Sequence, residues 1–355
     1  MTFVTSGVKQ PLSGDKPLIL TQGDPAGVGP AISLLAWEAL HRDPEYAFYI
    51  RGGSHHLRRE ASRLNLDVDL VEISTPSEAI DVFRDALPVL DLPGTDVEAG
   101  IPDVKAATGI VASIENGVRD VQSGEADAIV TNPISKSLLY ATGFPHPGHT
   151  EFLAELARSD KDSEAPLPVM MLVGGGLRVA LATIHIPLMN VAGVLTPEHL
   201  VNIGVRVHSA LKWDFGLVSP RLGICGLNPH AGEDGTIGRE DVDIIQPAIE
   251  ALRSMDVNAI GPRPGDTVFH EALSGRYDAV IAMYHDQGLI PVKTLDIWGG
   301  VNATLGLPFV RTSPDHGTGY DAAKTGDVRA DSLIAAIRLA RDMATNRKAF
   351  EMQHG

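Results

Sequence analysis

Cysteine is nearly absent from this sequence, since Cys225 is the only one among 355 residues. A single cysteine excludes an intramolecular disulfide and favours a reducing, cytoplasmic compartment. Cys225 stands in a short apolar run at residues 222–227, which predicts a buried strand. We therefore interpret its thiol as inert rather than nucleophilic.

The sequence also lacks long apolar runs and an excess of positive charge. No run approaches the roughly 20 apolar residues of a membrane-spanning helix. Residues 1–16 have neither the basic start nor the apolar core of a signal peptide, and we expect a mobile tail there. Asp and Glu number 45 against 29 Lys and Arg, which gives a net charge of −16. Because nucleic acids and anionic membranes require basic surfaces, we expect neither as a partner. An anionic substrate must then be attracted by a local basic cluster.

The remaining bulk properties are those of an ordinary globular protein, with 44% hydrophobic and 21% charged residues. A length of 355 residues exceeds one ordinary core and predicts two domains or lobes. Short apolar runs alternate with segments of helical periodicity, with a β-hairpin expected around residues 174–176. This alternation favours α/β layers over a barrel or a bundle. Residues 74–104 show little secondary-structure signal, and we expect them to form an irregular segment on the surface.

Residues 277–323 hold the densest group of candidate functional residues. A predicted buried strand at 279–283 leads into Tyr284 and His285, and ligands of open α/β sheets bind at the carboxyl ends of strands. A lone histidine there is usually structural, but a polar and glycine-rich stretch follows. Because this stretch shows little helical periodicity, we interpret it as a loop that wraps a ligand. Its polar residues are Lys293, Asn302, Arg311, Asp315 and His316.

Three histidines, His185, His230 and His285, each follow a predicted buried strand. Histidines at matching strand ends can converge, and three imidazoles with an open fourth position form a catalytic site for a divalent metal. The alternative is that they are scattered surface histidines, because the chain contains 13. Spacing alone leaves both interpretations open.

Other predicted strands also end in candidate groups, each with a structural alternative. The strand at 17–21 leads to a glycine-rich turn at 23–30 and then to a helix. This turn either binds an anion or allows the helix to pack tightly against the strand. Lys136, after the strand at 126–130, is either an exposed cation at a helix start or a site residue. Thr150 begins another helix, where it either donates to an anion or merely caps the helix.

Seven ordered motifs are spread along the chain: LTQGDPAGVGP (20–30), TNPISK (131–136), PGHTEF (147–152), ATIHIPL (182–188), GLNPHAGEDGTIGRED (226–241), YHDQG (284–288) and VNATLGLPFVRTSPDHGT (301–318). Together they resemble the NAD-dependent 4-hydroxythreonine-4-phosphate dehydrogenases (PdxA) of vitamin B6 biosynthesis. The resemblance extends over roughly residues 17–345.

The resemblance implies the fold of the isocitrate and isopropylmalate dehydrogenase superfamily. That fold has two α/β/α lobes with a cleft between them. We expect residues 17–125 and 300–355 to form lobe one, which binds NAD. Residues 126–299 are expected to form lobe two, which holds the metal, the substrate and the dimer contacts.

The resemblance also implies three groups of site residues. The metal ligands would be His185, His230 and His285, holding Zn, Mg or Co. The substrate and its phosphate would be bound by His149, Thr150, Lys293, Asn302 and Arg311, although surface solvation is the alternative for Lys293 and Arg311. The dinucleotide, NAD with NADP as an alternative, would be bound by Gly306, Asp315, His316, Gly317 and Asp321.

The implied reaction is oxidation of 4-phosphooxy-L-threonine at C3, followed by decarboxylation to 3-amino-2-oxopropyl phosphate. The metal would act as a Lewis acid on the secondary alcohol and would stabilise the developing enolate. Lys136 and Asp266 are the candidates for the base. The family also implies a homodimer with a shared active site, in which His185 and His230 come from one subunit and His285 from its partner.

Other functions remain as alternatives. Residues 294–301 do not match the family pattern, and close relatives act on phosphorylated four-carbon sugar acids or on aromatic cis-dihydrodiol carboxylates. The basic cluster favours a substrate that carries phosphate. A phosphate-handling acyltransferase of the same superfamily needs neither three histidine ligands nor an NAD loop, and a non-catalytic binding protein leaves the cluster unexplained.

Overall fold

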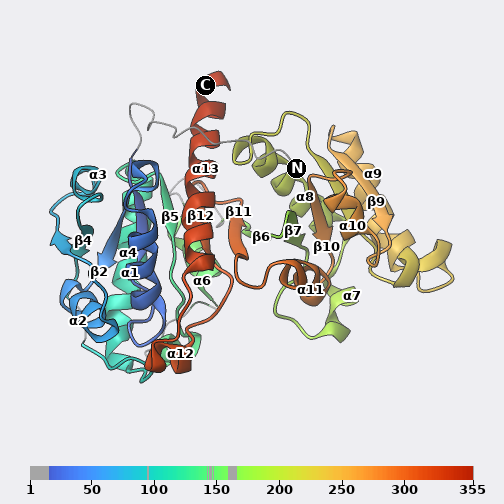
Figure 1. Cartoon of the computed structure of the whole chain (residues 1–355). Helices are drawn as coiled ribbons and strands as arrows, with labels where there is room; N and C mark the ends of the chain where they lie inside the picture. The colour runs from blue at the N-terminus through green and yellow to red at the C-terminus, as the bar shows by residue number, and fades with distance from the viewer. Residues whose placement is uncertain are drawn as a thin grey trace. The chain divides into compact units, whose positions relative to one another are not determined.

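The computed structural model describes residues 16–93, 96–141, 143, 146, 148–158 and 166–354. Apart from Lys16, the tail predicted for residues 1–16 lies outside the described residues. The chain divides into two compact units. Unit 1 comprises residues 1–158 and 309–341, and unit 2 comprises residues 159–308 and 342–355 (Figure 1).

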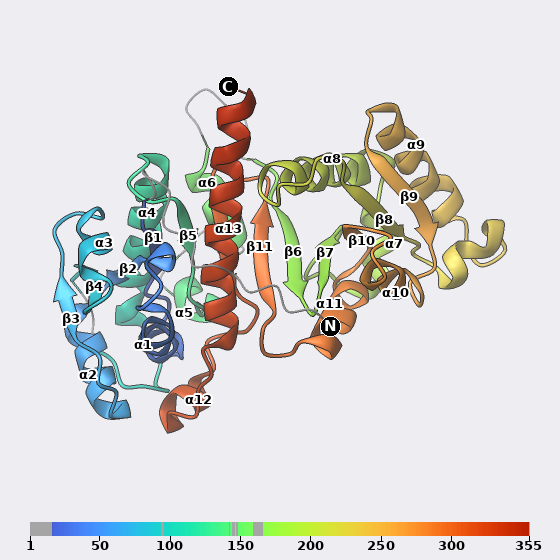
Figure 2. The same cartoon turned by 45° about the horizontal axis from the view of Figure 1, so that its top comes forward.

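Unit 1 is built on parallel strands in the order β3-β4-β2-β1-β5-β12. Helices lie on both sides of these strands, with α1 and α2 on one side and α3 and α4 on the other (Figure 2). A parallel sheet covered on both faces has apolar strands, and β1 and β2 are accordingly buried. The strands are β1 (Leu18–Thr21), β2 (Phe48–Gly52), β3 (Leu70–Glu72), β4 (Leu87–Asp91), β5 (Ala128–Val130) and β12 (Val310–Pro314).

The helices of unit 1 lie between and after its strands. They are α1 (Gly29–Leu40), η1 (Pro44–Tyr46), α2 (Ser54–Leu64), α3 (Glu78–Val82), η2 (Val104–Ala106), α4 (Ala107–Gln122), α5 (Lys136–Tyr140), α6 (His149–Leu156) and α12 (Tyr320–Thr325). The last helix, α13 (Asp331–His354), contributes its first eleven residues to this unit. Its predicted apolar face is buried, as Leu333 and Ile337 have no exposed surface.

Unit 2 has strands in the order β11-β6-β7-β10-β8-β9. β6 pairs antiparallel with β11 and β7, whereas β7, β10, β8 and β9 are parallel neighbours. The hairpin predicted around 174–176 is confirmed as the β6–β7 turn. The strands are β6 (Val169–Gly174), β7 (Leu177–Leu181), β8 (Arg221–Cys225), β9 (Asn258–Arg263), β10 (Ala279–Ala282) and β11 (Val301–Leu305).

Most of the candidate residues of unit 2 lie in or next to its helices. They are η3 (Leu188–Asn190), α7 (Val191–Val194), α8 (Pro197–Trp213), η4 (Pro229–Gly235), the π-helix η5 (Asp241–Ile245), α9 (Gln246–Ser254), α10 (Val268–Leu273), α11 (His285–Leu295) and the end of α13. Thr196 caps α8 by accepting a hydrogen bond from the His199 N–H. Pro197 follows at the first helical position, which its fixed φ favours.

The predicted α/β class is confirmed, but two local predictions were wrong. Much of the stretch that we interpreted as a wrapping loop is regular: residues 285–295 form α11 with Pro291 inside it, and residues 301–305 and 310–314 form β11 and β12. Its buried side is narrow, comprising Gly288, Leu289 and Val292, so the helical period is faint in the sequence. The stretch 74–104 contains β4, an inner strand between β3 and β2, whose Pro88 obscured the strand pattern.

The division of the chain also differs from the predicted lobes. β5 pairs with β1, so residues 126–158 belong to unit 1 rather than to the lobe expected from residue 126 onward. β11 pairs with β6, and residues 300–308 accordingly belong to unit 2. Strand pairing that is distant in sequence sets both boundaries. Among the described residues, no helix has the length and apolar character needed to cross a membrane.

Candidate functional site

A buried cation marks the carboxyl end of β5 in unit 1. β12 pairs with β5 in parallel and carries Arg311, which is 3% exposed. The Arg311 Nε and Nη2 atoms donate to the Thr131 hydroxyl at 3.1 and 2.7 Å. Burial lowers the pKa of Arg311 to about 10, so the side chain remains charged at neutral pH. A buried guanidinium of this kind attracts an anion strongly.

His149 lies within reach of this cation and is the first residue of α6. Its burial, together with the positive charges of Arg311 and Lys136, holds the pKa of His149 well below its usual range. The imidazole is therefore neutral at pH 7. Its Nε2 atom is buried and has no hydrogen-bond partner among the described residues. A neutral imidazole with the proton on Nε2 can donate to an anionic oxygen.

The beginning of α6 brings further groups to the same place. Lys136 is the exposed first residue of α5, and its Nζ atom would lie 3.2 Å from a Cβ placed on Gly148, beside the Glu151 Oε2 atom at 2.7 Å. Gly148 is the N-cap of α6, so Thr150 is the second helical residue and does not cap the helix. The alternative that Thr150 is only a cap is therefore wrong. In unit 1 the structure thus brings together Lys136, His149 and Arg311 as a cationic and donor-rich cluster.

The glycine-rich turn at 23–30 is occupied by internal contacts. The buried Asp24 carboxylate accepts hydrogen bonds from the Ala26 N–H at 3.0 Å and from the Tyr320 hydroxyl at 2.6 Å. The Val28 N–H donates to the Thr318 carbonyl at 2.8 Å. A Cβ on Gly27 would lie 2.7 Å from that carbonyl oxygen, which explains the glycine. Of the two interpretations of this turn, the structure supports tight packing.

The residues predicted to bind the dinucleotide fall into two places. Asp315, His316 and Gly317 lie between β12 and α12 in unit 1, and Asp321 is the second residue of α12; His316, Gly317 and Asp321 are exposed. Around Gly317 the described residues leave room, since no atom lies within 4 Å of an added Cβ. This segment could accommodate part of a dinucleotide. Gly306 belongs to unit 2, where its φ of 83° and its approach to the Leu167 carbonyl give it a structural role in a turn.

Two of the three predicted metal ligands meet in unit 2. β7 and β10 are parallel neighbours, so the segments that leave their carboxyl ends lie at one edge. The ring centroids of His185 and His285 are 5.6 Å apart. Both rings line a hollow of about 220 Å³ together with Thr183, Tyr284 and Asp286. Two imidazoles that bind one tetrahedral metal at about 2.1 Å have centroids roughly 5 Å apart, so this pair fits a divalent ion.

Carboxylates orient two of the histidines. The His285 Nδ1 atom lies 2.8 Å from Asp286 Oδ1, and the His230 Nδ1 atom lies 2.7 Å from Glu233 Oε1. A carboxylate on Nδ1 places the proton there and leaves Nε2 as the ligand nitrogen. The hydrogen bond and the charge of Glu233 raise the pKa of His230, and the charge of Asp266 adds to this effect.

His230 belongs to a turn of unusual backbone conformation. His230, Ala231, Gly232, Glu233 and Asp234 all have φ between 42 and 78°. Left-handed residues other than glycine are costly, and runs of them mark functional positions. Such a turn puts the side chains of residues 230 and 233 on one side, where they form the hydrogen bond described above.

A buried carboxylate anchors this turn. Asp241 is 1% exposed and accepts hydrogen bonds from the Leu227 N–H at 2.8 Å, the Asn228 N–H at 3.1 Å and the Asn228 side-chain amide at 3.0 Å. A Cβ on Gly232 would lie 3.2 Å from its Oδ2 atom. Asp241 therefore fixes the path of the chain between β8 and His230.

The structure does not assemble the whole predicted metal site within one chain. Among the described residues, no three His, Cys, Asp or Glu side chains are arranged to hold a metal ion. His185 and His285 come together, whereas His230 is not grouped with them. Lys293 is half-buried on α11, and Asn302 on β11 has a buried Oδ1 atom that lacks a partner within the described part of the chain. Cys225 is buried, and burial raises the pKa of its thiol, as expected for an inert side chain.

Sequence reasoning missed two residues that hold the candidate groups in place. Thr131 accepts both hydrogen bonds from Arg311, and Gln287 bonds to the main chain at two strand ends. Both stand within motifs that were recognised, TNPISK and YHDQG. The available signal was the position of Thr131 directly after a strand.

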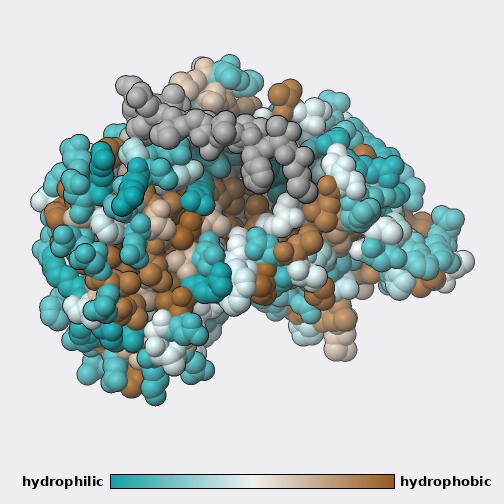
Figure 3. Space-filling view, in the orientation of Figure 1, coloured by the Kyte–Doolittle hydropathy of each residue, from teal (hydrophilic) through white to brown (hydrophobic). Residues whose placement is uncertain are grey.

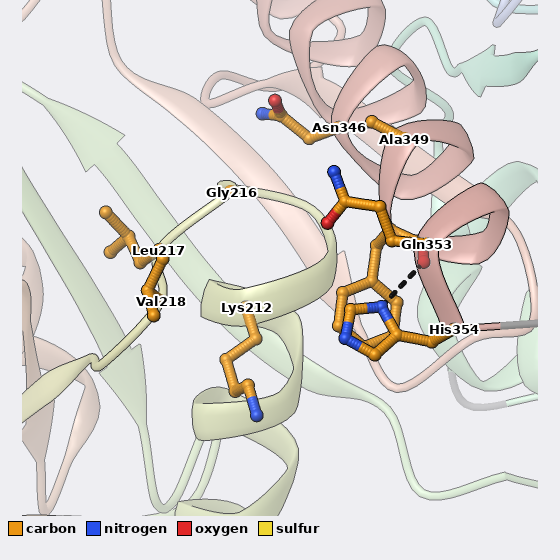
Figure 4. A pocket seen from close by; sticks show the side chains of 9 residues that line it. Lys212, Gly216, Leu217, Val218, Asn346, Ala349, Gln353 and His354 are labelled. Carbon is orange, nitrogen blue, oxygen red and sulfur yellow. Dashed lines mark hydrogen bonds between the residues drawn. The ribbon is translucent and has the colours of Figure 1, made fainter.

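A larger hollow of unit 2, of about 420 Å³, lies elsewhere (Figure 4). It is lined by the end of α8 and the end of α13, with Lys212, Leu217, Val218, Asn346 and Phe350 among its residues. The His354 Nδ1 atom lies 2.9 Å from the Phe350 carbonyl, and the two rings are stacked. None of the predicted site residues lines this hollow, so we do not assign the reaction to it.

Comparisons with known proteins identify the family of the chain. The family model described as "Pyridoxal phosphate biosynthetic protein PdxA" matches residues 45–340. The chain is 51% identical to a 4-hydroxythreonine-4-phosphate dehydrogenase of Caulobacter vibrioides, over 94% of this chain and 98% of that protein. A crystal structure of a 4-hydroxythreonine-4-phosphate dehydrogenase from Klebsiella pneumoniae is 35% identical, with a TM-score of 0.81, 93% of this chain and 100% of that chain covered. A crystal structure of a terephthalate 1,2-cis-dihydrodiol dehydrogenase from Burkholderia xenovorans is 28% identical, with a TM-score of 0.62. That match covers 92% of this chain and 98% of the Burkholderia chain.

Proposed function

This chain belongs to the family of the pyridoxal phosphate biosynthetic protein PdxA, and on that basis we propose that it is a 4-hydroxythreonine-4-phosphate dehydrogenase. It oxidises 4-phosphooxy-L-threonine at C3 with NAD and releases CO2, which leaves 3-amino-2-oxopropyl phosphate. This reaction serves the synthesis of pyridoxal phosphate. We place the enzyme in the cytoplasm, in accord with its single, unpaired cysteine.

The observation that carries this proposal is the cluster of Lys136, His149 and Arg311 in unit 1. The chain has a net charge of −16, so a phosphate dianion needs a local positive site. Burial, and then the charges of Arg311 and Lys136, hold the pKa of His149 low, which supports grouping these three side chains. The buried Nε2 atom of His149 lacks a partner among the described residues and is suited to a phosphate oxygen.

The chain's own residues would position the reacting carbon. His185 and His285 fit a divalent ion, and the partly exposed segment 315–321 fits part of NAD. When bound, the ion supplies a Lewis acid and the nicotinamide supplies the hydride acceptor. Asp266 is our choice as the base that accepts the proton of the C3 hydroxyl, because its charge acts on His230. Lys136 acts on His149 and so serves the phosphate instead.

A panel of substrates tests the proposal. Purified protein with a divalent ion is mixed with NAD or NADP, and NADH or NADPH absorbance is followed. We expect turnover with 4-phosphooxy-L-threonine and NAD, and a large loss with 4-hydroxythreonine, which lacks the phosphate. Turnover that prefers an aromatic cis-dihydrodiol carboxylate, as the name of the Burkholderia relative suggests, or a phosphorylated four-carbon sugar acid would contradict the proposal.

We also propose that the enzyme is a homodimer with a shared active site. Unit 2 exposes apolar side chains next to both histidines, and Figure 3 shows apolar surface over α11 and α7. Such a patch is typical of an interface. The pairing of His185 with His285 in one chain favours a division in which the partner supplies His230. This differs from the predicted division, in which His285 comes from the partner. The exposed apolar residues are Ile186, Leu188, Met189, Val194, Ile290, Leu295, Ile297 and Trp298.

A further inference from the structure

The side chain of Gln287 connects two strand ends of unit 2. Its Oε1 atom accepts a hydrogen bond from the Met283 N–H at 2.7 Å, and its Nε2 atom donates to the Gly226 carbonyl at 2.8 Å. Met283 follows β10 directly, and Gly226 follows β8 directly. One amide therefore spans the carboxyl ends of two neighbouring parallel strands.

The carbonyl group of the same residue, Met283, is also hydrogen-bonded. The Thr183 hydroxyl donates to the Met283 carbonyl at 2.8 Å. Thr183 stands two residues after β7, which neighbours β10 on the side opposite β8. The main chain at Met283 is thus hydrogen-bonded by side chains from the segments after β7 and β10, and Gln287 extends the connection to the main chain after β8.

Each of these segments carries one predicted metal ligand a few residues further on. His185 follows Thr183 by two residues, His230 follows Gly226 by four, and His285 follows Met283 by two. Beyond the last paired residue the strand ladders no longer fix the main chain, so side-chain bonds must do so. Gln287 and Thr183 supply such bonds at this point.

We propose that Gln287, together with Thr183, is a positioning residue that fixes the three histidine-bearing segments relative to one another. This inference rests on the proposed function, because it takes the histidines as metal ligands; in the proposed dimer, His185 and His285 serve one site and His230 of the same chain serves the other. It assigns Gln287 no contact with the ion or the substrate. Loss of residues that orient metal ligands typically lowers metal affinity ten- to a hundred-fold. A residue needed only for stability would leave that affinity unchanged once the protein is folded.

Two substitutions test the link with matched controls. Gln287→Met and Thr183→Val keep the side-chain volume and remove the hydrogen bonds. Asn346→Leu removes a side-chain bond to the Asp214 carbonyl, and Thr312→Val removes a buried hydroxyl bond of the same 2.8 Å length to the Ala336 carbonyl. Neither control bond involves the segments that follow β7, β8 and β10.

The first measurement is hydrogen–deuterium exchange of the metal-free protein. In Gln287→Met, we expect faster exchange in residues 226–233 and 283–287, and neither control should change these segments. Gln287→Glu keeps the acceptor for Met283 and loses the donor to Gly226, so only residues 226–233 should exchange faster. Gln287→Glu also tests the inference in place of Gln287→Met if the latter does not fold.

The second measurement is the affinity for Co²⁺ by competition with a chelator. We expect a loss of tenfold or more for Gln287→Met and Thr183→Val, and a change of less than twofold for the controls. Unchanged exchange at residues 226–233, or Co²⁺ affinity within twofold of wild type in Gln287→Met, overturns the inference. Failure of the wild-type protein to bind Co²⁺ would instead contradict the metal site of the proposed function, while the exchange data would still decide whether Gln287 links the segments.

Discussion

His149 shows how one half-buried group reports on the charge around it. Burial and the cations Arg311 and Lys136 lower its pKa in the folded state below the value of about 6.5 expected when unfolded. Between these two values the unfolded state binds more protons than the folded state. Stability therefore falls as the pH drops below about 6.5 and is regained as the pH rises.

This direction of the pH dependence of stability gives a prediction for His149→Asn, which removes the titrating ring. The melting temperature of the wild type should fall more steeply between pH 7 and pH 5 than that of the variant. Thermal unfolding at several pH values measures the two slopes. Parallel slopes would show that His149 is not held neutral in the folded protein.

Arg311 carries the prediction for phosphate recognition. Arg311→Lys keeps a charge but loses the bidentate fork, and loss of a charge-assisted contact costs about 2–4 kcal/mol of transition-state binding. We expect kcat/KM for the phosphorylated substrate to fall by roughly 30-fold or more, with almost no further loss for 4-hydroxythreonine. Arg341→Lys is the matched control, because Arg341 is equally buried but pairs with Asp127. Equal losses on both substrates would assign Arg311 to the fold or to NAD.

At the scale of elements, the left-handed turn that carries His230 makes a prediction about stability. Ala231 has a φ of 55°, which glycine adopts at lower cost, so Ala231→Gly should leave stability unchanged or raise it by up to about 1 kcal/mol. Gly232→Ala should lower it by about 1–2 kcal/mol, because φ is 78° and the new Cβ would approach Asp241. Urea unfolding of both variants measures the difference. A loss in Ala231→Gly as large as that in Gly232→Ala would contradict the turn geometry.

The elements also show what the sequence could and could not reveal. The meeting of His185 with His285 was predictable in outline, because each follows a buried strand and parallel strands end at one edge. The pairing of β5 with β12 was not, since it joins residues about 180 apart and no local pattern encodes such a register. Arg311 and Thr131 meet only through that pairing.

The turn at His230 was hidden for a different reason. Left-handed backbone is usually signalled by glycine or asparagine, and His230 and Ala231 are neither. Its conformation depends on the buried carboxylate of Asp241, which lies eleven residues away from His230. Likewise, α11 was missed because Gly288 and Pro291 oppose a helix that packing against β6 and β7 maintains.

At the scale of the whole molecule, pairwise mixing of inactive variants tests the shared site. His185→Ala, His230→Ala and His285→Ala are mixed two at a time, unfolded and refolded together. If the partner supplies His230, both mixtures that contain His230→Ala should regain activity, to roughly a quarter of all sites when half of the dimers are mixed. The mixture of His185→Ala with His285→Ala should remain inactive.

The other outcomes of the mixing experiment are equally informative. Recovery in both mixtures that contain His285→Ala would restore the division implied by the family resemblance. Absence of recovery in every mixture, with mixed dimers shown to be present, would place all three ligands on one chain and refute the shared site.

The central claim is that the chain couples oxidation at C3 to loss of the carboxyl group of a phosphorylated hydroxy amino acid. The most direct test follows NADH and CO2 together as the purified, ion-loaded protein consumes 4-phosphooxy-L-threonine. The account predicts one NADH and one CO2 for each substrate molecule, and neither product after a chelator removes the ion. NADH without CO2, or equal turnover without a divalent ion, would contradict it.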